Sequence, residues 1–152
     1  MNEIRVFELS HLAKLTGVEL SAVKNWTNGR ILNISPSIRQ ADQRGARNLF
    51  NEKDVLKVHI AHKMNLLGFS PKGAIEEVLE RFDEEYEKEG FERISNAPWL
   101  LIRNSGKWEV LFREGRNPKL TFPLEDGGLL LSLNLSQITK RIKEGLTKKE
   151  EK

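Results

Sequence analysis

The sequence predicts an α+β fold, with a helical first half and a second half built mainly of strands. Up to about residue 90, apolar residues recur at spacings of three and four, which is the period of an amphipathic helix. Beyond Pro98 they alternate with polar residues, which is the period of a strand that buries one face. From the points where these patterns change we expect three regions: residues 1–69, 70–92 and 93–152.

The composition is that of a folded protein: of 152 residues, 38% are hydrophobic and 31% are charged. There is no cysteine, which excludes disulfides, thiolate metal sites and cysteine nucleophiles. No stretch resembles a signal peptide or approaches the roughly 18 continuous apolar residues of a membrane span. We therefore expect a soluble, cytoplasmic protein with no membrane partner.

Charge is unevenly distributed along the chain. Residues 1–72 carry 11 Lys and Arg against 6 Asp and Glu, residues 73–98 carry 3 against 9, and residues 99–152 carry 11 against 7. The net charges are therefore +5, −6 and +4, in agreement with +3 for the whole chain. A basic first part indicates that an anionic partner, if there is one, docks there.

Residues 7–28 are predicted to form two short helices joined by a tight turn. The first ends at Gly17, because glycine takes the left-handed conformation of a helix C-cap without a steric penalty. The second begins near Leu20 and ends at the turn signal Asn28-Gly29. The apolar residues expected between the two helices are Leu12, Val18, Val23 and Trp26.

Residues 31–50 lack a helical period and are rich in Ser, Arg, Gln and Gly. Their apolar ends, Ile31-Leu32 and Leu49-Phe50, predict two short strands joined by a long, basic loop. Such a loop directly after a helical hairpin is where a wing would reach a DNA backbone.

Two longer helices follow. Asn51 and Asp54 form an approximate capping box at the start of the first, which continues to Gly68. Ser70-Pro71 begins the second, since it offers a cap followed by the one position where a helix tolerates proline, and Gly90 ends it. The second helix has one apolar stripe, and its opposite face is nearly all acidic.

The remaining elements are strands and one helix. The turn segments 104–106 and 125–128 each separate a pair of alternating stretches, and Asn134 caps a last helix. Strands are expected at residues 99–103, 107–113, 120–124 and 129–133.

The second helix of the hairpin carries a polar stripe without an acidic residue, formed by Ser21, Lys24, Asn25 and Asn28. Lysine can donate to guanine or phosphate, and asparagine can bond adenine through two hydrogen bonds. Arginines behind the helix would contact phosphates, which fixes the register and supplies affinity. They are Arg30, Arg39, Arg44 and Arg47. The hairpin alone favours a core element with a solvated face; the basic loop that follows favours DNA binding.

Three segments follow one another in the order LAKLTGVELSAVKNW, GARNLFNEKDVLKV and MNLLGFSPKGAIEEVL. They resemble the helix-turn-helix, the wing and the helix junction of the MerR family of winged helix-turn-helix transcriptional regulators. The resemblance covers about Ile4 to Leu79. It implies a homodimer that binds double-stranded DNA at a pseudo-palindromic operator, with RNA polymerase as a further candidate partner.

Carried over position by position, the resemblance implies that Lys24 contacts phosphate, where the family usually has arginine, and that Arg47 is the wing arginine. Trp26 stands at a family aromatic. The sequence departs from the family pattern at Glu19, which replaces the usual serine cap, at Asn25, which replaces a common tyrosine, and at Arg30, where the family tends to have glycine. The segment between Arg47 and Phe50 is also one residue longer than usual.

The helix predicted over residues 70–89 stands where the family builds its antiparallel dimer coil. The resemblance therefore implies a dimer interface on its apolar stripe, while packing of the same stripe onto the C-terminal region is the alternative. The stripe residues are Ile75, Leu79, Phe82 and Tyr86.

Other kinds of site find little support. His59 and His62 lie three apart on one helix, but the further ligands of a metal site are missing. No phosphate-binding loop, nucleophile elbow or Ser/His/Asp pattern is present, so we expect neither an enzyme nor a cofactor. One aromatic group could line an effector pocket, although we favour a core role for it: Trp99, Trp108, Phe112 and Phe122.

The sequence thus predicts a dimeric, sequence-specific transcriptional regulator. One alternative is an architectural or excisionase-like protein that bends DNA. Another is a protein-interaction module that uses the same fold without DNA. The sequence specifies neither the operator nor an effector.

Overall fold

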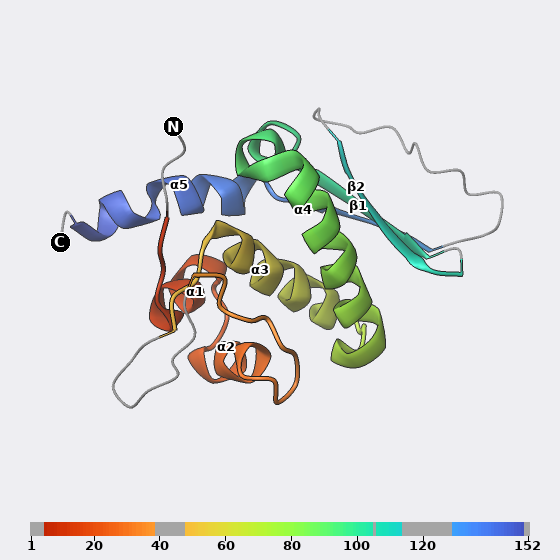
Figure 1. Ribbon diagram of the computed structural model, residues 1–152, viewed down its shortest axis with the longest axis horizontal. Coiled ribbons are helices and arrows are strands. Elements are labelled where there is room, and N and C mark those ends of the chain that lie inside the picture. Colours follow the sequence, from red (N-terminus) through yellow and green to blue (C-terminus); the bar gives the residue numbers. More distant parts are fainter. Residues whose placement is uncertain (1–4, 39–47, 105, 114–128, 151–152) are drawn as a thin grey trace.

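The predicted α+β class is confirmed by the computed structural model, which describes residues 5–38, 48–104, 106–113 and 129–150, with the backbone alone at 129–130 and 145–150. A short turn, η1 (Pro71–Ile75), joins the third helix to the fourth (Figure 1). The helices of the described part are α1 (Leu9–Thr16), α2 (Leu20–Thr27), α3 (Glu52–Leu66), α4 (Glu76–Asn96) and α5 (Ser136–Glu150). Its strands are β1 (Trp99–Asn104), β2 (Trp108–Arg113) and β3 (Leu129–Asn134).

The strands form one antiparallel sheet in the order β2-β1-β3. Leu100 of β1 stands opposite Phe112 of β2 and Leu133 of β3, which places these three apolar side chains on one face. Helix α4 covers that face (Figure 1). The predicted hairpin of β1 and β2 is confirmed, and β3 pairs with β1; the predicted strand over residues 120–124 lies outside the described residues.

Helix α4 differs at both ends from the helix predicted over residues 70–89. It begins at Glu76, because Lys72 and Gly73 have non-helical backbone angles and Gly73 has a φ of +99°. Gly90, with a φ of +76° and a ψ of 164°, interrupts the regular helix at the position where the sequence predicted its end, and a further helical stretch follows after this kink. The chain resumes its helical path to Asn96 because Phe91 and Ile94, beyond the bend, are buried in the core.

The apolar stripe of α4 is covered by the chain itself. Ile75 and Phe82 are fully buried and Leu79 nearly so. The ring of Phe82 meets that of Phe112 of β2 edge to face, with 5.8 Å between the centroids, and Tyr86 donates to Glu52 Oε1 at 3.4 Å. The predicted dimer interface on this stripe is therefore not an exposed surface. The stripe packs partly onto the C-terminal region, as in the alternative, and partly onto α3.

One hydrophobic cluster extends through all three predicted regions. Helix α5 returns from the sheet to the beginning of the chain and packs against α1 and α3 (Figure 1). Ile138 and Ile142 of α5 are buried, and Arg141 Nη1 donates to the carbonyl of Leu15 at 3.4 Å. Helix α5 thus helps to hold α1 in place.

Candidate nucleic-acid interface

Helices α1 and α2 form a hairpin around a tight turn at Gly17. This residue has a φ of +73°, and its N–H donates to the carbonyl of Ala13 at 2.9 Å, which closes the last turn of α1. Helix α3 packs against α1. The apolar residues predicted between the helices are all buried: Leu12, Val18, Val23 and Trp26. The predicted hairpin is confirmed, and its interior determines which side of α2 faces outward.

The structure brings three of the four predicted base-contacting residues together on an exposed face. Ser21, Lys24 and Asn28 are exposed, whereas Asn25 is half-buried. The chain beyond α2 folds back over Asn25, because the N–H of Ile31 donates to its carbonyl at 3.0 Å. The same bond explains why the strand predicted at Ile31-Leu32 does not form: the segment pairs with the end of the helix instead of with another strand.

Asn28 already uses its side chain in the turn that ends α2. Its Oδ1 accepts the N–H of Arg30 at 2.9 Å. Since a bidentate contact with adenine needs the amide oxygen as well as the nitrogen, such a contact would have to share or replace this bond. Arg30 itself is exposed just beyond the turn, where its guanidinium is free of the core.

An apolar residue that the sequence analysis did not single out joins this face. Leu20, the first residue of α2, is 43% exposed. It lies four residues before Lys24, so the helical period places the two side by side. A hollow of about 330 Å³ opens beside it, lined by Glu8, Leu9, Ser10, Leu20 and Asn48. The signal was present in the sequence as an apolar residue on the otherwise polar side of the helix.

The loop of residues 39–47, with Arg39, Arg44 and Arg47, lies outside the described residues, but both of its flanks are described. The N–H of Ile38 donates to the carbonyl of Leu49 at 3.1 Å. Phe7 and Phe50 exchange two backbone hydrogen bonds of 2.8 Å each. The chain therefore leaves and re-enters the described structure at neighbouring points, as the predicted wing requires.

Asp54 holds the beginning of this loop against the start of α3. It is fully buried, and its carboxylate accepts from the Ser37 N–H at 2.9 Å, the Ser37 hydroxyl at 2.7 Å and the Asn51 N–H at 3.0 Å. The Asn51 side chain in turn accepts from the Asp54 N–H at 3.2 Å, which confirms the predicted capping box. The contact with Ser37, 17 residues away, had no local signal in the sequence.

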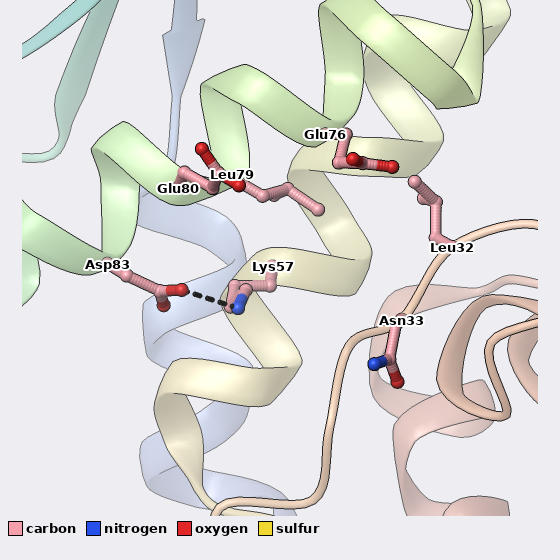
Figure 2. Close-up of a pocket in the computed structure, with 7 residues that line it drawn as sticks. All are labelled: Leu32, Asn33, Lys57, Glu76, Leu79, Glu80 and Asp83. Atoms are coloured by element: carbon pink, nitrogen blue, oxygen red, sulfur yellow. Dashed lines mark hydrogen bonds and ion pairs between the residues drawn. The ribbon is translucent and has the colours of Figure 1, made fainter.

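A second hollow, of about 300 Å³, lies where the segment after α2 approaches α3 and α4 (Figure 2). Lys57 of α3 and Asp83 of α4 meet at its edge, with 2.8 Å between Nζ and Oδ2. The ion pair joins α3 to α4, and its lysine is almost fully buried. The lining residues are Leu32, Asn33, Lys57, Glu76, Leu79, Glu80 and Asp83.

The two histidines of α3 lie against other side chains of the fold. His62 lies near Trp26, with 6.2 Å between the ring centroids. Burial and, to a lesser extent, charge repulsion from Lys63 together lower the pKa of His59 to about 4. Burial also lowers the pKa of His62. Both imidazoles are therefore neutral at neutral pH.

Of the four aromatic residues that could line an effector pocket, Trp108 and Phe112 are buried in the core, which agrees with the core role expected for them. Trp99 is half-buried, and Phe122 lies outside the described residues. Within the described residues, no group of three or more His, Cys, Asp or Glu is arranged to hold a metal ion.

No protein-family model and no curated protein matches the sequence. Among the helices of the described part, none is both long enough and apolar enough to cross a membrane. Since no match assigns a role to the exposed face of α2, its residues are the basis for inferring that role.

Proposed function

We propose that this protein is a sequence-specific DNA-binding transcriptional regulator that inserts α2 into the major groove. The observation that carries the proposal is the exposed face of α2, where Ser21, Lys24 and Asn28 project from a helix whose other side is buried. From Leu20 to Ile38 the chain contains no Asp or Glu, so the DNA backbone meets no fixed negative charge along this segment. A helix of this kind, supported by a second helix, fits the major groove.

The residues of this face have different proposed roles. Lys24 of α2 and Arg30, just beyond its end, are exposed cations, and they supply phosphate or guanine contacts. Ser21 and Asn28 contact base edges. Asn25, which is half-buried, contributes at the edge of the face only. The wing arginines Arg39, Arg44 and Arg47 remain predicted phosphate contacts.

A homodimer belongs to the proposal, because a pseudo-palindromic operator presents two equivalent half-sites. Its interface has to lie elsewhere than on Ile75, Leu79 and Phe82, since these side chains are buried within one chain. RNA polymerase stays a candidate partner of the DNA-bound protein.

The proposal is tested by selecting bound duplexes from a random pool and measuring their affinities at several salt concentrations. We expect one motif to be enriched. Lys24→Gln should weaken binding to all duplexes and reduce the slope of log K against log salt by about 0.9, the value for one phosphate contact.

A matched control is Lys140→Gln, which removes the same charge from an exposed position on α5. Helices α5 and α2 lie on opposite sides of α1 and α3 (Figure 1), so this variant should bind as the wild type does. Equal effects of the two variants would show non-specific attraction by net charge. No enrichment of any duplex would refute DNA recognition and favour a protein-interaction module.

A further inference from the structure

We propose that Leu20 determines part of the sequence specificity by contacting the C5 methyl group of a thymine. This inference rests on the proposed function, and it concerns the side of the α2 face that the polar residues do not occupy. The proposed contact is apolar, whereas the other residues of this face donate or accept hydrogen bonds.

The first argument is the position of the exposed leucine. Four large apolar side chains are exposed in the described part of the chain: Leu20, Ile38, Leu66 and Leu67. Of these, only Leu20 lies on α2, where Ser21 follows it and Lys24 stands one turn further along. Residues at the N-terminal end of a recognition helix are the ones that reach base edges. Leu20 therefore lies at the end of α2 that comes closest to the bases.

The second argument is the chemistry of the major groove. The base pairs present hydrogen-bond donors and acceptors there, and the C5 methyl of thymine is the apolar group among them. An apolar side chain that becomes buried in the groove gains free energy against this methyl, whereas against a polar base edge it would leave donors or acceptors without partners. The partner that suits Leu20 is a thymine.

The third argument is the space around Leu20. A single exposed leucine is common on protein surfaces and by itself indicates nothing. Here, however, Leu20 shares a hollow of about 330 Å³ with Leu9 of α1, and the hollow opens at the start of the proposed recognition helix. The two leucines supply the apolar part of a lining that also contains Glu8, Ser10 and Asn48, with room for a methyl group beside them.

The experiment uses the full chain and the best duplex from the random-pool selection, with each thymine in turn replaced by uracil. The replacement removes the methyl group and leaves base pairing unchanged. We expect a rise in Kd of about fourfold at one position of each half-site, the factor that corresponds to burying one methyl group. Leu20→Ala should bind the original duplex about as weakly as the wild type binds the uracil duplex, and should show no further loss on uracil at that position.

The control variant is Leu66→Ala, which truncates a leucine that is 67% exposed at the end of α3. It should keep the full fourfold effect of uracil. Specific binding in which no thymine responds to uracil, or in which Leu20→Ala keeps the wild-type response, would overturn this inference and leave the proposed function standing. A complete failure of the selection would overturn both.

Discussion

Replacing His59 by leucine should make the protein less sensitive to acid. The imidazole lies on α3, where its Nδ1 is buried and has no hydrogen-bond partner within the described part of the structure. Its neighbours are cationic or neutral: Lys63 and His62 on the same helix, and Arg141 on α5. Because none of them stabilises the charged form, a proton on His59 is unfavourable in the folded state.

The size and sign of the effect follow from the two pKa values of His59. The pKa is about 4 in the folded state and 6.5 in an unperturbed histidine. Above pH 6.5 both states hold neutral imidazole, so the histidine adds no pH dependence. Between pH 6.5 and 4 the unfolded state binds a proton that the folded state does not, and the free energy of unfolding falls. The loss is on the order of 3 kcal/mol by pH 4 and levels off below it.

The measurement is urea unfolding of the wild type and His59→Leu at pH values from 7.5 to 3.5. Carboxyl groups titrate in both proteins, so the informative quantity is the difference between the two curves. We expect this difference to be constant above pH 6.5 and to shift in favour of His59→Leu as the pH falls to 4. His62→Gln is the control, since His62 is much less buried and should alter the curve far less. Parallel curves for the wild type and His59→Leu would refute the reasoning.

Two further predictions concern contacts between elements. Ser37→Ala removes the hydroxyl that donates to the buried Asp54 carboxylate. In chemical denaturation it should lower the free energy of unfolding by about 1–2 kcal/mol. The control Ser35→Ala, at an exposed position, should change it by less than about 0.5 kcal/mol. An equal loss in both variants would contradict the anchoring role. Lys57→Met keeps the buried alkyl stem but breaks the 2.8 Å ion pair with Asp83, and should cost about 1 kcal/mol in thermal unfolding. Lys88→Met, at a largely exposed pair, should leave the melting temperature within error.

The features that sequence reasoning predicted correctly are encoded within short segments. The hairpin follows from apolar spacing and from a glycine at the one position that needs a positive φ. The capping box of Asn51 and Asp54 needs only residues three apart. The strands β1 and β2 follow from an apolar run and an alternating stretch on either side of a short turn. Each of these patterns can be recognised because the interacting residues are close in the chain.

The features that it missed depend on contacts between distant segments. Asn25 became half-buried because the chain after α2 folds back over it, and helical spacing alone cannot show this. The helical stretch from Gly90 to Asn96 was not predicted, and it forms where Phe91 and Ile94 pack into the core. The partner of Asp54 lies 17 residues away at Ser37. In each case the tertiary environment, which no local pattern contains, decided the outcome.

The site itself was predicted only in part for the same reason. Ser21, Lys24 and Asn28 are exposed as expected, because the buried side of α2 could be assigned from its apolar residues. Leu20 entered the sequence analysis only as the start of the helix, and its exposure of 43% depends on how the surrounding segments pack, which the spacing of residues does not show.

The return of α5 to α1 and α3 has a consequence for synthesis on the ribosome. The hairpin of α1 and α2 is synthesised well before Ile138 and Ile142, the buried residues of the helix that packs against α1 and α3. Until α5 has been made, the apolar surface of α1 and α3 that it covers stays exposed on the nascent chain.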